Sequence, residues 1–162
     1  MKEKSGFSLA RKDEAMAELV NETDHTTLAI WTVDCVERVL PYFEIQSQLD
    51  HRPGDAIVAL LRWIQTGVFS MAEIRKASLD AHAAADEVGK DNAARSAAHA
   101  AGQAAATAHA ATHALAAAAY AQQAIFLSAI PSEAEAAAAR ERDWQYRHLC
   151  ALRESRESVE IP

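Results

Sequence analysis

The feature that most constrains the fold of this chain is a long stretch without a single charged side chain. It runs from Ser96 to Ser132, contains no Lys, Arg, Asp or Glu, and is rich in alanine. Alanine is the best helix former, and its small side chain lets neighbouring helices approach closely. The stretch therefore predicts one long helix that stands as the central pillar of an all-helical domain, enclosed by the other helices.

The length and composition indicate a single domain with a core of small side chains. A chain of 162 residues suits one domain and buries about two-thirds of the surface that its unfolded form exposes. Half of the residues are hydrophobic but only 6% are aromatic, so we expect many alanines and a few large anchors in the core. Helices around such a core have to pack closely to fill it.

Proline and glycine are few, and they fall between segments with helical periodicity. They divide the chain into about six predicted helices, over residues 9–21, 24–40, 53–67, 70–89, 91–127 and 131–154. No segment shows the alternation that is typical of a strand. The predicted fold is an all-α, single-domain bundle of about six helices around a long central alanine-rich helix.

Three parts are expected within this fold. Residues 1–23 form an N-terminal amphipathic helix, which is either a swinging or partner-swapped arm or an edge helix of the domain. Residues 24–154 form the bundle, and residues 155–162 form a frayed tail. Local signals mark some positions: Ser70 and Glu73 make a capping box, and Gly102 either kinks the pillar or lets another helix touch its backbone.

The charge and the cysteine content of the chain limit the cellular compartment and the classes of partner that we expect. The net charge of −7 disfavours a phosphate-binding surface, so nucleic acid is not expected as a partner. The polar N-terminal residues lack an apolar signal segment, which predicts a cytoplasmic protein. An apolar segment over 114–130 is interrupted by Gln122 and Gln123, and we expect it to be buried in protein rather than in a membrane. Cys35 and Cys150 lie in apolar helical patterns typical of buried, reduced thiols.

The histidines allow two interpretations. His109 and His113 are four residues apart and would share one face of the predicted pillar, with His99 further back on that face. With a group from another helix, such as His82 or Asp34, they would offer ligands for a metal ion. The pair lacks the glutamate of the H-E-x-x-H motif, so no general base is built into the same turn. The interpretation we favour is that these imidazoles form hydrogen bonds in a polar layer of the core and hold no metal.

A second constellation consists of charged residues on two predicted helices. Asp34, Glu37 and Arg38 lie on the second helix, and Glu141 and Arg142 lie on the last. Paired carboxylates can act as acid and base, but acids that alternate with arginines within a bundle favour ion pairs that hold the helices in register. The sequence has no glycine-rich phosphate loop and no G-x-S-x-G motif, so neither a cofactor nor a catalytic residue is predicted.

An ordered series of motifs resembles one family. The motifs are Asp34-Cys35-Val36-Glu37-Arg38-Val39-Leu40-Pro41, Asp50-His51-Arg52-Pro53, His82-Ala83-Ala84-Ala85, Ala100-Ala101-Gly102-Gln103-Ala104-Ala105-Ala106-Thr107-Ala108-His109 with His113-Ala114, and Glu141-Arg142-Asp143-Trp144-Gln145. Together, over about residues 28–149, they resemble the immunity-five-like family of bacterial putative immunity proteins, which are alanine-rich helical domains of polymorphic toxin systems. A histidine often stands in that family where this chain has Gln103, and another where it has Arg38.

The resemblance implies a toxin-neutralising module that binds a cognate protein toxin and carries out no reaction. The alternative function, taken from the histidines, is a metal-dependent helical-bundle enzyme in which His82, His109 and His113 converge on one ion. A homodimer formed by alanine-lined helices across a two-fold axis is compatible with either function. The candidate binding or polar-core residues are Asp34, Glu37, Arg52, His82, His99, His109, His113, Glu141, Arg142 and Trp144.

Overall fold

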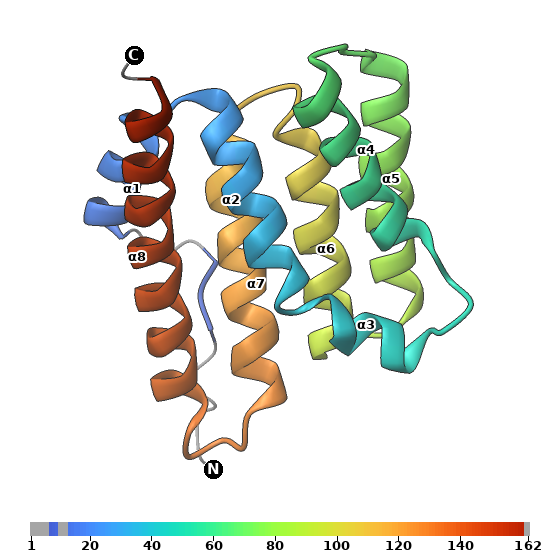
Figure 1. Cartoon of the computed structure of the whole chain (residues 1–162). Helices are drawn as coiled ribbons and strands as arrows, with labels where there is room; N and C mark the ends of the chain where they lie inside the picture. Colours follow the sequence, from blue (N-terminus) through green and yellow to red (C-terminus); the bar gives the residue numbers. More distant parts are fainter. Residues whose placement is uncertain (1–6, 10–12, 161–162) are drawn as a thin grey trace.

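The protein is an all-helical bundle (Figure 1). The computed structural model describes residues 7–9 and 13–160, and within them it contains eight α-helices and no strand. The helices are α1 (Glu14–Asn21), α2 (His25–Glu37), α3 (Leu40–Gln46), α4 (Arg52–Thr66), α5 (Met71–Glu87), α6 (Ala93–Ala106), α7 (His113–Ser128) and α8 (Ala134–Glu160). The predicted all-α class is confirmed, but the prediction of about six helices is too low. None of the helices in the described part of the chain is long and apolar enough to cross a membrane.

The largest difference from the prediction concerns the alanine-rich stretch, which forms two helices instead of one pillar. Helix α6 ends at Ala106, the chain reverses through residues 107–112, and α7 runs back beside α6 (Figure 1). At the reversal, the amide and the hydroxyl of Thr107 both donate hydrogen bonds to the carbonyl oxygen of Gln103, each over 3.1 Å. The imidazole of His25, on α2, contacts the carbonyl oxygen of Thr107. The prediction of a long central helix is therefore wrong.

The physical reason for the reversal is the length of the neighbouring helices. A single helix over 91–127 would be about 50 Å long, whereas α4 and α5, with 15 and 17 residues, are each about 25 Å long. Beyond the ends of α4 and α5, the side of such a helix that faces them would have no helix to pack against. After the reversal α6 packs against α3, α4, α5 and α7, and α7 packs against α2, α6 and α8.

Other boundaries differ by smaller amounts. The second predicted helix is divided, because α2 ends at Glu37 and Pro41 lies in the first turn of the separate helix α3. Helix α1 begins at Glu14 rather than at Leu9, and it packs against α7 and α8 as an edge helix of the bundle. Helix α8 continues past Ser155 to Glu160. Residues 1–6 and 10–12 of the predicted arm and residues 161–162 of the predicted tail lie outside the described residues.

Several helix starts agree with the local sequence signals. The Ser70 hydroxyl accepts a hydrogen bond from the amide of Glu73 at the start of α5, over 3.3 Å. The Asn92 side chain accepts one from the amide of Arg95 at the start of α6, over 2.9 Å. Side-chain oxygens at these positions satisfy amides that have no partner within the helix. These starts are therefore encoded within four residues of each boundary.

The core combines alanines with a few large anchors. Trp31, Phe43, Leu60 and Leu149 are completely buried, and they come from α2, α3, α4 and α8. Between them lie the buried alanines of α6 and α7, which account for most of the buried residues of these two helices. The expected core composition is confirmed.

Gly102 marks a close contact between α5 and α6. A Cβ atom added to this glycine would lie 2.7–2.9 Å from the Nε2, Cδ2 and Cε1 atoms of His82, which is shorter than real Cβ contacts. The imidazole of His82 therefore packs directly on the α6 backbone. Of the two roles predicted for Gly102, the structure selects close approach by another helix.

We predict that Gly102→Ala destabilises the protein by about 1 to 3 kcal/mol, because the added methyl overlaps a ring held between two helices. Gly54→Ala is the control, because nothing lies within 4 Å of a Cβ at this position in the first turn of α4. Urea denaturation of both variants measures the difference. A Gly102→Ala variant as stable as Gly54→Ala would contradict the proposed packing.

Candidate functional site

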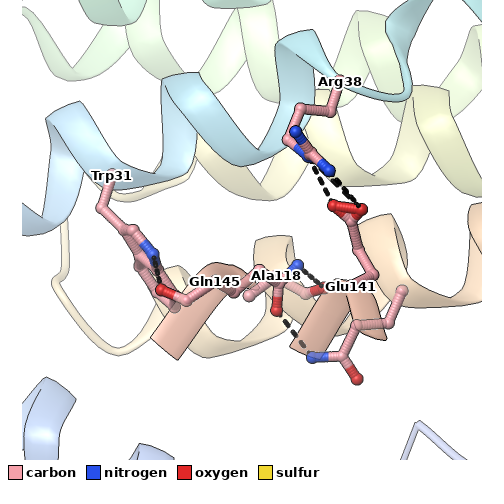
Figure 2. A network of polar contacts seen from close by, with 6 residues as sticks. Trp31, Arg38, Ala118, Glu141 and Gln145 are labelled. Atoms are coloured by element: carbon pink, nitrogen blue, oxygen red, sulfur yellow. Dashed lines mark hydrogen bonds and ion pairs between the residues drawn. The ribbon is translucent and has the colours of Figure 1, made fainter. Parts of the chain in front are cut away.

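An ion pair joins α2 to α8 across a buried interface. The Nε atom of Arg38 lies 2.5 Å from Oε1 of Glu141, and its Nη2 atom lies 3.2 Å from Oε2 (Figure 2). Glu141 is only 5% exposed, whereas the Arg38 side chain is 42% exposed. A buried carboxylate is costly unless it is paired, so Arg38 compensates the burial of Glu141. Of the two predicted interpretations of these charges, the geometry favours the ion pair.

The same interface carries a stack of planar side chains. The guanidinium carbon of Arg38 lies 3.8 Å from the ring centroid of Trp144. The imidazole of His148 stacks on Trp144 at 4.7 Å with an interplanar angle of 15°, and its Nε2 atom lies 2.7 Å from Oδ2 of Asp34. Stacking of this kind adds to the attraction between the helices. Asp34 and Trp144 thus belong to one arrangement with the Arg38–Glu141 pair.

A buried amide continues this network into the core. The indole N–H of Trp31 donates to the backbone oxygen of Gln145, over 2.9 Å, and the Gln145 amide donates to the backbone oxygen of Ala118, over 3.0 Å (Figure 2). The amide of Gln122 donates to the side-chain oxygen of Gln145. Gln145 thereby connects α2, α7 and α8. Within the described residues every buried side-chain nitrogen or oxygen has a hydrogen-bond partner.

Two imidazoles meet between α5 and α6. The Nδ1 atoms of His82 and His99 lie 2.7 Å apart, which requires one ring to donate a proton and the other to accept it. Tyr120 of α7 contacts the ring of His99, with the ring centroids 5.1 Å apart. Asp86 lies 3.8 Å from Nε2 of His99 and also pairs with Arg95. This group of residues fastens α5 to α6 and α7.

The pair takes up protons less readily than free histidine. Burial, followed by the neighbouring His82 and Arg95, lowers the pKa of His99 from 6.5 to about 4, against the opposing effect of Asp86. Burial also lowers the pKa of His82, and His113 adds to this effect. Both imidazoles are therefore neutral at pH 7, so one ring can accept the hydrogen bond that the other donates.

The remaining histidines of the predicted cluster point elsewhere. His113 forms a hydrogen bond with the side-chain oxygen of Gln103, over 2.8 Å. His109 lies in the α6–α7 reversal, is exposed, and stacks on Phe69 with centroids 6.2 Å apart. The prediction that His109 is buried, on one helix face with His113, is wrong because the helix ends before it. In the part of the chain that the structure describes, no three His, Cys, Asp or Glu side chains form a group that could hold a metal ion, so His82, His109 and His113 do not converge.

Three further candidates lie apart from both groups. Glu37 is exposed at the end of α2. Arg52, at the start of α4, pairs with Asp50 over 2.7 Å and with Glu87 over 2.5 Å. Arg142 is half-buried and lines a cavity of about 760 Å³ between α1, α7 and α8. The candidates therefore fall on several sites and do not form a single one.

The cysteines act as packing residues. Cys35 is completely buried, and burial, reinforced by Glu141 and Asp34, raises the pKa of its thiol well above the usual value. Cys150 is half-buried, and neither cysteine forms a disulfide. A neutral, buried thiol is a poor nucleophile, so Cys35 serves the core.

Comparison with known proteins identifies the family. The family model described as Imm-5 like putative immunity protein matches residues 18–152. The chain belongs to this family. No curated protein and no solved structure matches it. The resemblance found in the sequence motifs is thus confirmed, and both polar groups described above fall within the part of the chain that the family model covers.

Several residues of the polar groups in this immunity-family chain escaped the sequence analysis, namely Asp86, Arg95, Tyr120, Gln145 and His148, and so did His25 outside these groups. His25 contacts Thr107 and the ring of Trp63, and Asp86 completes the imidazole group. His25 follows a helix cap and Asp86 is one of several acids on α5, so neither has a local signal of a distant contact. Only the approach of helices from separate parts of the chain creates these contacts.

We predict that Arg38→Met lowers the free energy of unfolding by about 2 to 3 kcal/mol, because it leaves the carboxylate of Glu141 buried and unpaired. The value is below that for a fully buried pair because Arg38 is partly exposed. The double variant Arg38→Met, Glu141→Leu removes both charges and should recover most of the loss. Denaturant titration of the single and double variants measures the coupling, and equal losses in both would rule out the ion pair as the cause.

We predict that the His82–His99 pair makes the free energy of unfolding fall in acid. The unfolded chain binds a proton at His99 near pH 6.5, whereas the folded chain does so near pH 4. The contribution of His99 to the free energy of unfolding is therefore complete above pH 6.5. It is lost as the pH falls towards 4, and the loss amounts to up to about 3 kcal/mol. His99→Gln should flatten the pH dependence of unfolding in this window, whereas His51→Gln, at an exposed position, should not. Identical pH profiles for all three proteins would refute the assignment.

Proposed function

We propose that this protein is an immunity protein that neutralises a cognate bacterial toxin by direct binding, without carrying out a reaction. The observation that carries the proposal is the family match over residues 18–152. The protein acts in the cytoplasm, where the toxin would otherwise reach its target. Its partner is a protein, and the contact blocks the active site of the toxin.

The polar contacts inside the bundle support a binding role for the outer surface. Arg38 is paired with Glu141, Asp34 contacts His148, and His82 contacts His99. Each of these groups is engaged with a partner from another helix, so its first effect is to hold the helices in place. A rigid scaffold of this kind keeps the exposed residues in a fixed arrangement, which reduces the entropy lost on binding.

The segment over residues 13–24, which contains α1, has the charge that would attract a basic toxin. Residues 13–24 contain the acids Asp13, Glu14, Glu18, Glu22 and Asp24 and no basic residue. Glu14 and Glu18 are exposed, lie one turn apart on α1, and have no ion-pair partner among the described residues. Acidic side chains in such positions raise the association rate with a basic protein, and salt weakens their effect.

The direct test of the proposal uses the product of the gene next to the one that encodes this chain. Expression of that product alone should arrest bacterial growth, and coexpression with this chain should restore it. The two purified proteins should form a complex by size-exclusion chromatography. Growth arrest without rescue, or rescue without a complex, would contradict neutralisation by direct binding.

We predict that Glu14→Lys with Glu18→Lys lowers the association rate with this toxin about tenfold at low salt, and much less at high salt. Glu44→Lys with Glu133→Lys is the matched control, because it changes the net charge equally at exposed positions outside α1. Surface plasmon resonance at two salt concentrations measures both variants. Equal effects of the two variants would show that only the net charge matters and that α1 is not the docking side.

A further inference from the structure

Helices α4 and α5 form one edge of the bundle, opposite the edge formed by α1 and α8 (Figure 1). Helix α5 packs against α4 and α6, which leaves its opposite side open to solvent. Among the exposed residues of α5, four recur every three or four positions, at Ala72, Arg75, Leu79 and Ala83, and these form one stripe along the helix. A second stripe on α4 contains Asp55, Val58 and Arg62. We call these two stripes together the α4–α5 face.

Exposed apolar side chains gather on this hairpin. Of the ten large hydrophobic side chains that are exposed among the described residues, five belong to α4, α5 or the turn between them: Val58, Val68, Phe69, Met71 and Leu79. Leu79 is 57% exposed and Val58 is 51% exposed. Single exposed apolar residues are ordinary, but a concentration on one edge is typical of an interaction surface.

The charges of the hairpin distinguish it from the rest of the chain. Residues 52–87 carry four basic and five acidic side chains, a net charge of −1, whereas the whole chain carries −7. Most of these charges are already neutralised within the protein: Arg62 pairs with Glu73, Lys76 with Asp80, Arg52 with Glu87, and Asp86 with Arg95. The hairpin therefore combines exposed apolar side chains with nearly balanced charges, on a protein that is otherwise acidic.

We propose that the α4–α5 face binds a second copy of this chain, forming a symmetric dimer. In a two-fold dimer each face meets an identical face, so a strongly acidic surface would repel itself. The α4–α5 face avoids this repulsion because its charges are balanced. Among the described residues, the charges of the hairpin without an ion-pair partner are Asp55 and Arg75, which have opposite signs. In a two-fold dimer, Asp55 of one copy can pair with Arg75 of the other.

The size of the face reaches the lower limit for a specific dimer. Two helices about 25 Å long and about 10 Å wide present about 500 Å² in projection on each copy. The total of about 1,000 Å² reaches the size of a specific interface. The proposed dimer leaves α1 and α8, at the other edge, free for a different partner, so it is independent of the proposed toxin binding.

The test is sedimentation equilibrium of the full chain across a concentration series. The wild type should have twice the chain mass of 17.6 kDa, and Leu79→Glu should raise the dissociation constant of the dimer by more than about tenfold because it places two carboxylates in the interface. Ile130→Glu is the matched control, because Ile130 is 60% exposed and lies between α7 and α8. Thermal melts monitored by circular dichroism establish that each variant is folded. If Leu79→Glu does not fold, Val58→Lys serves as a second interface variant.

The outcomes of this experiment show whether the α4–α5 face binds a second copy of the chain or the toxin. A dimer that is lost in the Leu79→Glu variant and kept in the Ile130→Glu variant supports the proposal. A wild type that is monomeric at every concentration overturns it, as does a dimer that both variants weaken equally. If the wild type is monomeric and Leu79→Glu abolishes binding to the neighbouring gene product, the face belongs to the toxin and the dimer proposal fails, while the immunity function stands.

Discussion

The close packing of alanine-lined helices is the constraint on which the rest of this structure depends. Alanine contributes a single methyl group, so each contact between α6 and α7 adds less hydrophobic stabilisation than a leucine contact would. The compensation is proximity, because short side chains bring the helix backbones close together and increase the number of atoms in contact. The approach is also close at Gly102, because the absence of a side chain there lets the imidazole of His82 pack on the backbone of α6.

Proximity alone does not specify the register of such helices, because one alanine face resembles another. The polar groups supply that information. Arg38 and Glu141 fix α2 against α8, and His82 and His99 fix α5 against α6. Each pair has a defined geometry, and a shifted register would leave at least one of its members buried without a partner. The histidines and carboxylates that suggested chemistry in the sequence thus fit a structural role.

The two edges of the bundle differ in a way that suits two kinds of partner. Residues 13–24, around α1, are acidic and include Glu14 and Glu18, which have no ion-pair partner among the described residues, whereas the charges of the α4–α5 hairpin are nearly balanced. An acidic surface favours a basic protein, which fits the toxin binding proposed above. A balanced apolar face favours a copy of itself. The bundle between them separates the two surfaces.

The sequence by itself determined the all-helical class, the start of α5 at Ser70, and the family, because these depend on composition and on signals within a few residues. It also limited Gly102 to two roles. The tertiary structure alone decided the reversal at 107–112, the exposure of His109 and the pairing of Arg38 with Glu141. The alanine stretch has the same helix propensity throughout, so its end depends on where the surrounding helices cease to cover it. A partner for a charged side chain likewise depends on which helix lies opposite, and that is settled only when the helices pack.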